Sequence, residues 1–377
     1  MEVFASISCA SVTTRWLEAV ASLADPNARQ TVLINVGANK GYMLAMWMAL
    51  FTQRSEFGVL GQSRDFGVQW HHGVLGYAHA HHAHALRSQS YLSCGVCGAC
   101  KDRLTASAVA HNRSNGVAHA LDILLPNVQL MSSVANMTGV SERVHVHHLA
   151  GSNQSGTTKM WIGGSYKTSI QAGRESNALC DSEAECMRGN NSNTGRAWPV
   201  QSVRLDDFIR TRKFVLGEVF LVSIDAEGVD ALILEGMRES LAAKAVSIVH
   251  FEKHMKGYWA DSHPERRTLG GVIALLYSSG YECFVEGMQA LIPISGTCWR
   301  QNLDQISWSN VVCAHSPAML RAMRTVQMRD SESLVRDWVR HRGGMDKAIE
   351  ASVVRASPRA RCWLDKIRQG SQQAHAP

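Results

Sequence analysis

The segment from Thr31 to Leu50, TVLINVGANKGYMLAMWMAL, constrains the fold more than any other part of this chain. An apolar run at residues 32–34 leads into a turn with two glycines, Gly37 and Gly41, and then into an apolar, helix-like segment. This order predicts a buried strand, a tight turn and a helix. Such a turn lets a nucleotide-like ligand approach the backbone, where free N–H groups meet its polar atoms. The spacing matches neither the dinucleotide G-x-G-x-x-G nor a Walker loop, and a plain strand-to-helix connection is the alternative.

The composition is that of a globular protein with a substantial core. Of 377 residues, 45% are hydrophobic and 19% are charged, which allows one large domain or two ordinary ones. No segment approaches the roughly 18–20 apolar residues of a membrane span, and no signal peptide is evident. We therefore expect a cytoplasmic location by default. The net charge of +6 is mild, so no nucleic-acid partner is expected, and the sequence does not indicate an oligomeric state.

Three regions are predicted along the chain. Residues 1–30 form an N-terminal helical segment, residues 31–315 the main domain, and residues 316–377 a basic helical tail. Two stretches interrupt the main domain: a Cys/His-rich insertion at 53–115 and a polar loop at 163–198.

Strand-like and helix-like segments alternate through the main domain. This alternation predicts a mostly parallel sheet covered by helices on both faces. In such sheets ligands bind at the carboxyl ends of strands, where Asn35, Asp122, Asp225 and Glu252 all lie. The segment Leu205–Phe208 opens a short helix, for which an aspartate is the expected N-cap. Strands are predicted at residues 117–122, 144–149, 218–225, 245–252, 281–285 and 308–314, and a hairpin at 157–162 with 201–204.

Two acids, Asp225 and Glu227, follow one of the predicted buried strands directly. Carboxylates in such a place are costly unless solvent or a ligand meets them. Acids that stabilise a helix N-terminus through its dipole are the alternative interpretation.

Four segments together resemble the FkbM-type family of S-adenosylmethionine-dependent methyltransferases. They are INVGANKGY (34–42), SVRLDDFI (202–209), IDAEGVDALILEG (224–236) and SIVHFEKH (247–254), in the family's order and spacing. The resemblance covers roughly residues 30–315 without the insertion. It implies a Rossmann-like class I methyltransferase fold with a mostly parallel seven-stranded sheet and helices on both faces. It also implies S-adenosylmethionine as the cofactor, and we expect O-methylation of a hydroxyl on a small-molecule or glycan-like acceptor.

The resemblance implies a cofactor site at the glycine turn and the neighbouring strand ends. The turn is expected to hold the methionine part of the cofactor, and Asp122 the ribose hydroxyls, since a carboxylate accepts two hydroxyl protons. Two positions depart from the family pattern: Asn35 replaces an Asp, and Asp122 lies in LDILLPN where the family has Glu-Pro. The implied cofactor-binding residues are Asn35, Gly37, Ala38, Asn39, Gly41, Tyr42, Asp122, Ala150 and Asp225.

The resemblance places the reacting centre beside Asp225 and Glu227, which match its D-x-E-G motif, with Glu252 and His254 on the substrate side. We expect Asp225, Glu227 or His254 to accept the proton of the acceptor hydroxyl or to orient the substrate. The near-neutral pKa of an ordinary histidine suits a base, although a structural His254 is the simpler alternative. A divalent metal held by Asp225, Glu227 and Glu252 is a further alternative, because carboxylates suit magnesium.

Cys94, Cys97 and Cys100 form the remaining motif. With a fourth ligand from Cys180, Cys186 or the histidines at 79–84, they would hold a structural zinc ion. A disulfide or exposed thiols are the alternative.

A second class of function is a non-catalytic ligand- or partner-binding module on a methyltransferase scaffold. The replacement at Asn35 favours it. A nicotinamide dehydrogenase is a weaker alternative, because the glycine spacing is wrong for it.

Overall fold

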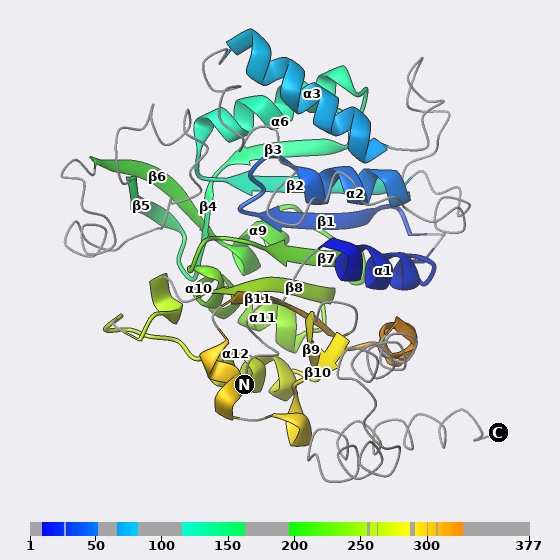
Figure 1. The fold of residues 1–377 in the computed structure, drawn as a ribbon, viewed down its shortest axis with the longest axis vertical. Coiled ribbons are helices and arrows are strands. Elements are labelled where there is room, and N and C mark those ends of the chain that lie inside the picture. The colour runs from blue at the N-terminus through cyan, green and yellow to red at the C-terminus, as the bar shows by residue number, and fades with distance from the viewer. Residues whose placement is uncertain are drawn as a thin grey trace, which may run out of the picture.

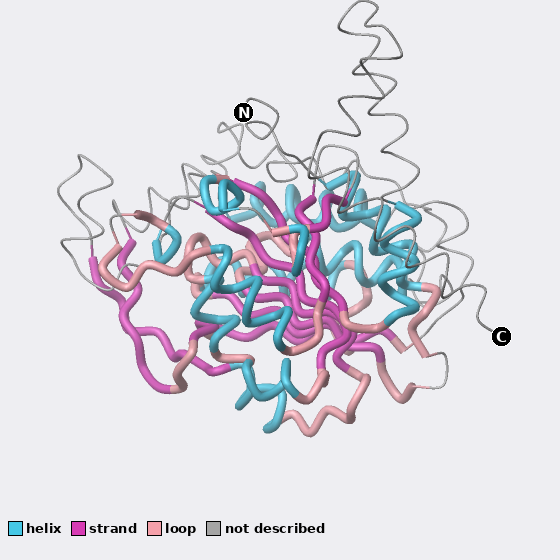
Figure 2. The backbone as a smooth tube through the Cα atoms, turned by 90° about the horizontal axis from the view of Figure 1, so that it is seen from below, coloured by secondary structure: helices cyan, strands magenta, loops and turns pink. Residues whose placement is uncertain are grey.

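An eight-stranded sheet runs through the protein between two layers of helices (Figures 1 and 2). The computed structural model describes residues 10–25, 28–51, 66–81, 115–162, 196–254, 257–261, 263–286, 291–299, 301–306 and 308–326. The strand order is β10 (Leu291–Pro293), β9 (Glu282–Glu286), β11 (Trp308–Ala314), β8 (Val246–His254), β7 (Val219–Ile224), β1 (Thr31–Val36), β2 (Gly116–Asp122) and β3 (Val144–His148).

The five strands from β3 to β8 are parallel, and β11, β9 and β10 continue the sheet in antiparallel pairs. The predicted mostly parallel α/β sheet with helices on both faces is confirmed. The predicted count of seven strands is wrong for the described residues. The three-residue strand β10 adds to the edge by pairing with β9, and a run that short has no periodicity to mark it in the sequence.

Two hydrophobic cores lie on the two faces of the sheet. Helices α1 (Ala10–Ala21), α2 (Tyr42–Phe51), α3 (Phe66–His81) and α6 (Leu125–Met137) bury their apolar side chains in one core. Helices α9 (Leu205–Thr211), α10 (Asp230–Glu235), α11 (Arg238–Ala242) and α12 (Leu269–Ser278) pack in the other. Burial on both faces explains why most residues of the strands β1 and β7 are apolar.

A smaller sheet lies beside the main one, in the order β4 (Ala150–Ser152), β6 (Arg196–Arg204) and β5 (Gly156–Ile162) (Figure 1). Strands β5 and β6 pair antiparallel, as the predicted hairpin requires. Short 3-10 helices, η6 (Gly257–Trp259), η7 (Gly296–Cys298) and η8 (Gln301–Gln305), complete the fold.

Part of the predicted insertion packs into the core. Helix α3 lies next to α2 and α6, and it buries Phe66, Trp70 and Val74. The indole N–H of Trp70 donates to the carbonyl of Lys40 at 2.7 Å, so this helix is bonded to the glycine turn. The start of the tail predicted at residues 316–377 also packs against the domain. Residues 317–326 are helical, and Met323 is fully buried in the hydrophobic core.

The expected aspartate N-cap of α9 is wrong. Arg204 occupies the N-cap position and makes no side-chain capping bond. Asp206 is buried and instead accepts the backbone N–H groups of Glu239 (3.0 Å) and Ser240 (2.8 Å) at the start of α11. The LDDF segment therefore joins two helices, a tertiary role that its spacing along the chain does not reveal.

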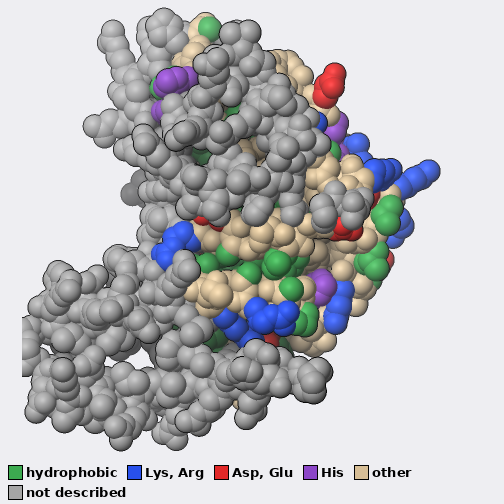
Figure 3. Space-filling model, turned by 90° about the vertical axis from the view of Figure 1, so that its right-hand side faces the viewer, with side chains coloured by type: hydrophobic (Ala, Val, Ile, Leu, Met, Phe, Trp, Pro, Cys, Tyr) green, Lys and Arg blue, Asp and Glu red, His purple; other side chains and the backbone are tan. Residues whose placement is uncertain are grey.

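Cys283 and Cys313 form a disulfide between the neighbouring strands β9 and β11, and both side chains are buried. Cys298 is also disulfide-bonded. None of the described helices is long and apolar enough to cross a membrane. On the face of the molecule drawn in Figure 3, lysine and arginine side chains of the described residues lie in separate groups with apolar side chains between them.

Candidate active site

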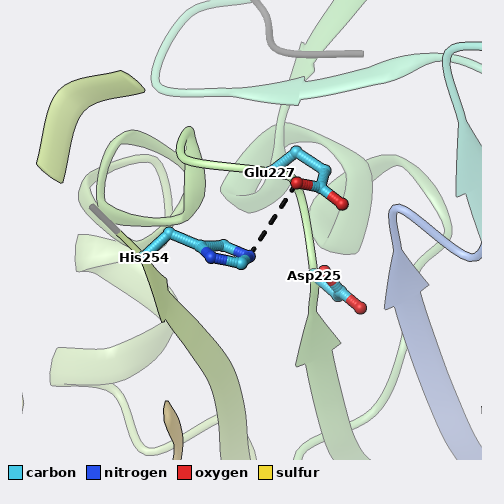
Figure 4. A group of neighbouring side chains, drawn as sticks. All are labelled: Asp225, Glu227 and His254. Carbon is cyan, nitrogen blue, oxygen red and sulfur yellow. Dashed lines mark ion pairs between the residues drawn. The ribbon is translucent and has the colours of Figure 1, made fainter. Parts of the chain in front are cut away.

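The loop after β7 carries the two acids of the D-x-E-G motif. Asp225 follows the strand directly, and its backbone N–H donates to the carbonyl of Val36 at 2.9 Å. Glu227 has a φ of 52°, a left-handed conformation that is uncommon for residues other than glycine. In this conformation Glu227 faces His254, which comes from the end of β8 (Figure 4).

Asp230 holds this loop in place from inside the protein. Its side chain is completely buried, and its two carboxylate oxygens accept the backbone N–H groups of Ala226 and Gly228, both at 3.1 Å. The N–H of Tyr258 donates to the carbonyl of Gly228 at 3.0 Å. Asp230 is a residue that the sequence analysis missed, because its place in the helix after the motif gave no sign that it bonds backward to the loop.

Strand β8 contributes the other two residues expected at the reacting centre. Glu252 and His254 lie on the same face of the strand, since alternate side chains point the same way. The Nε2 atom of His254 lies 2.5 Å from a carboxylate oxygen of Glu252 and 3.8 Å from one of Glu227. The indole N–H of Trp308, from β11, donates to the other oxygen of Glu252. Asp225, Glu227, Glu252 and His254 therefore lie together, as the resemblance implied.

The close approach of these acids changes their titration. Burial, and then the charge of Glu252, raises the pKa of Asp225 well above its ordinary value. Burial also raises the pKa of Glu252 to about 7 and that of Asp230 to about 7. Asp225 has a solvent-exposed side chain, so this carboxyl group is accessible. Side chains with raised pKa values in an accessible place are typical of functional sites.

The structure identifies one group of potential metal ligands among the described residues. Single donor atoms of Asp225, Glu227 and His254 all lie within 4.8 Å of one another. The ligand set expected from the sequence has Glu252 in place of His254. Cys94, Cys97 and Cys100 lie outside the described residues, and nothing in the described part of the chain supports a zinc site.

The glycine turn is bonded more tightly within the protein than expected. The N–H groups of Gly37 and Ala38 both donate to the carbonyl of Leu121, at 2.9 and 3.3 Å, and that of Gly41 donates within the turn at 2.8 Å. The expectation of free N–H groups is therefore wrong at these positions, because the end of β2 supplies an acceptor. A ligand at this turn would meet carbonyl groups and side chains, such as the exposed Asn39.

Asp122 is buried at the end of β2 and connects that strand to the glycine turn. Its two oxygens accept the backbone N–H groups of Asn39 (2.7 Å) and Leu124 (2.8 Å), and the side-chain amide of Asn127 reaches both at 3.3 Å. Burial raises the pKa of Asp122 to about 6. The predicted ribose contact would have to replace the long bonds of Asn127, since a carboxylate has about four acceptor positions.

Three further predicted cofactor residues lie around this edge of the sheet. Asn35 is buried within β1, between Ala120 and Ser223 of the neighbouring strands. The hydroxyl of Tyr42 lies 2.8 Å from the imidazole of His71. Ala150 is buried at the start of β4. Their contact with a cofactor stays a prediction.

Comparison with known proteins shows which family part of this chain is similar to. Residues 97–283 match the family described as the Methyltransferase FkbM domain, a span that contains Asp122 and the cluster around Asp225 but begins after the glycine turn. Among solved structures, the methyltransferase FkbM from Methylobacillus flagellatus KT matches with 9% sequence identity and a TM-score of 0.33. The alignment covers 76% of this chain and 44% of the Methylobacillus chain, so this chain spans less than half of the length of that protein. No curated protein matches.

Proposed function

Since the chain carries an FkbM methyltransferase domain at residues 97–283, we propose that it transfers a methyl group from S-adenosylmethionine to a hydroxyl group of a small-molecule or glycan-like acceptor. One observation carries this proposal: the four side chains Asp225, Glu227, Glu252 and His254 gather at the carboxyl ends of β7 and β8, directly beside the glycine turn.

The residues at this edge fit a cationic nucleoside. The carboxylates of Asp225 and Glu227 suit a positively charged sulfonium, and the backbone of Asp225 touches Gly37 of the turn. Asn39 is exposed at the tip of the turn, and its backbone N–H donates to the buried carboxylate of Asp122. When bound, S-adenosylmethionine supplies an electrophilic methyl group, so that a C–O bond forms while the C–S bond breaks and its electron pair stays on sulfur.

The protein's own part is to orient the acceptor hydroxyl and to receive its proton. Asp225, Glu227 and His254 are the groups available for this, because all three offer an acceptor atom within the same small volume. Glu252 holds the imidazole of His254 in place, and Trp308 in turn holds Glu252. A correctly placed base contributes roughly 10²–10⁴-fold to such a reaction.

The test is a methyl-transfer assay with tritiated S-adenosylmethionine on a panel of sugars and small hydroxyl compounds. We expect transfer by the wild-type chain and a drop of about 10²–10⁴-fold in Asp225→Asn and Glu227→Gln. Glu142→Gln is the matched control, because Glu142 is exposed at the opposite end of the sheet, before β3. Full activity in both site variants would show that these carboxylates do not act at the reacting centre.

A non-catalytic binding module is the second candidate, and a specific observation favours it. The backbone N–H groups of Gly37, Ala38 and Gly41 are occupied within the protein, as are the oxygens of Asp122. Calorimetric titration with S-adenosylmethionine separates the two candidates. Binding supports the enzyme, whereas a flat titration supports the module.

A further inference from the structure

The group Asp225, Glu227 and His254 has the composition of a metal-ion site. Two carboxylates and one imidazole come from the ends of two adjacent strands, and their donor atoms lie within 4.8 Å of one another (Figure 4). Adjacent ligands of an octahedral ion with bonds of about 2.1 Å lie about 3 Å apart. The 3.8 Å between Glu227 and His254 is close to that spacing, so small side-chain movements would bring all three onto one ion.

The backbone that carries these ligands is fixed. Asp230 bonds the loop that bears Asp225 and Glu227, and strand β8 carries His254 in the middle of the sheet. Glu252 contacts the imidazole at 2.5 Å and is itself bonded by Trp308. The contact of Glu252 is made with Nε2, the same atom that lies 3.8 Å from Glu227, so an ion bound there would take the place of the Glu252 contact.

The local charge also favours a cation. The carboxyl groups of Asp225, Glu227 and Glu252 interact electrostatically with one another, Asp230 interacts with Asp225 and Glu252, and His254 lies beside them. A divalent ion would balance the carboxylates that bind it. The acceptor oxygen becomes negative as it loses its proton, and the carboxylates alone would repel that charge.

We propose that Asp225, Glu227 and His254 bind a divalent cation of the Mn²⁺ type, and that this ion binds two neighbouring oxygens of the acceptor. Carboxylate ligands suit Mg²⁺ and Mn²⁺, and the imidazole shifts the preference toward Mn²⁺. Three protein ligands leave three octahedral positions open. Two adjacent open positions fit a vicinal diol, such as the one on a sugar ring.

This inference rests on the proposed function and gives its acceptor a chemical class. The ion would lower the pKa of a bound hydroxyl, which then loses its proton to water before the oxygen is methylated. His254 is then a ligand, and the ion takes over the activation of the hydroxyl.

The test measures Mn²⁺ alone, without cofactor or acceptor. The full chain is stripped with EDTA, dialysed and titrated with Mn²⁺, and the signal of free Mn²⁺ is followed by electron paramagnetic resonance. We expect one ion per chain in the wild type and at least a tenfold weaker affinity in Glu227→Gln and in His254→Gln. Glu142→Gln should bind like the wild type, and a thermal melt of each variant checks that it is folded.

Two results would overturn the metal site: no Mn²⁺ binding to the wild type, or unchanged affinity in both folded variants. A parallel titration with S-adenosylmethionine keeps the two proposals apart. Cofactor binding without Mn²⁺ binding would refute the metal site and leave the proposed methyltransferase function standing. Mn²⁺ binding without cofactor binding would refute the methyltransferase function and leave the metal site standing. If methyl transfer is found, a preference for vicinal diols over isolated hydroxyls, lost in EDTA, supports the acceptor class.

Discussion

A β carbon added to Gly37 would lie 1.8 Å from the carbonyl oxygen of Asp225. The turn after β1 and the loop after β7 therefore touch through their backbones, and the missing side chain is what allows it. From the sequence, this glycine is expected to allow the approach of a ligand. In the structure its first role is the contact between two parts of the protein.

Gly37→Ala should be strongly destabilising for this reason. Gly37 has a φ of 74°, and Gly139 has nearly the same φ, 75°, but with nothing within 4 Å of its missing β carbon. We expect Gly139→Ala to cost about 1–2 kcal/mol for its backbone conformation, and Gly37→Ala about 2–5 kcal/mol because the clash adds to that cost. Urea unfolding of both variants measures the difference. Equal losses would contradict the close contact.

Asp206→Ala should destabilise the protein without weakening cofactor binding. The substitution leaves the buried N–H groups of Glu239 and Ser240 without their acceptor, at a cost of about 1–3 kcal/mol. Asp207 is the matched control, because its bonds to Arg204 and Arg210 are near the surface, and Asp207→Ala should cost at most about 1 kcal/mol. Chemical unfolding and a cofactor titration on both variants test this. A weakened cofactor affinity in a folded Asp206→Ala would place this residue at the site.

Asp230→Asn should lower the turnover number (kcat) more than it changes cofactor affinity, provided the chain is a methyltransferase. An amide has one acceptor oxygen, so only one of the two loop bonds, to Ala226 or to Gly228, can remain. The acids of the loop then lose their position, and we expect kcat to fall by about tenfold, the equivalent of one hydrogen bond. Kinetics and calorimetry on the same preparation separate the two effects. A normal kcat would mean that the loop keeps its shape without this bond.

The imidazoles at the β2–β3 edge should make the protein sensitive to acid. His119 and His147 stack with their rings 5.4 Å apart; burial lowers the pKa of His119 to about 3 and that of His147 to about 4. The unfolded chain binds protons near pH 6.5, so stability is complete above that pH and is lost as the pH falls toward 4 and 3.

His147→Gln should reduce this acid loss relative to the wild type, with the exposed His72→Gln as the control. Melting temperatures between pH 4 and 8 show the effect as a difference between variants, which removes the opposite trend expected from Glu252. That acid has a raised pKa, so its contribution to stability is lost as the pH rises toward about 7. An unchanged acid slope in His147→Gln would rule out the stacked histidines as its cause.

Loss of the disulfide between Cys283 and Cys313 should cost about 2–4 kcal/mol, because the bond closes a loop 30 residues long in the unfolded chain. Unfolding of the double variant Cys283→Ser, Cys313→Ser measures this cost, and a reducing agent should no longer affect this part of the protein. Buried disulfides are typical of oxidising compartments, so a free-thiol count on protein from its natural source also tests the expected cytoplasmic location. Free thiols at both positions would contradict the bond.

Much of the architecture could be predicted from local pattern. The strand at residues 31–36 and the strand at 219–224 are mostly apolar, and glycines or acids follow each of them, so their type and direction are evident. The three-residue strand β10 was missed, because so short a run carries no periodic signal. Helix α3 was missed because its buried Trp70 is explained only by the glycine turn against which it packs.

The membership of the candidate site was predictable only in part. Asp225, Glu227, Glu252 and His254 follow from their positions at strand ends and from the family resemblance. Trp308 reaches Glu252 because β11 runs antiparallel to β8, a pairing between residues 56 positions apart in the chain.

Hydrophobic periodicity and turn-forming residues involve positions that are neighbours along the chain. For this reason the amino-acid sequence alone predicts an α/β sheet with acids at the carboxyl ends of its strands. Strand order and side-chain bonding involve residues far apart, so only the folded protein decides that Asp122 bonds the turn, that Asp206 bonds a distant helix, and that His254 meets Glu227. The physical reason is that hydrogen bonds and electrostatic interactions act over a few ångströms of space, whatever the separation in sequence.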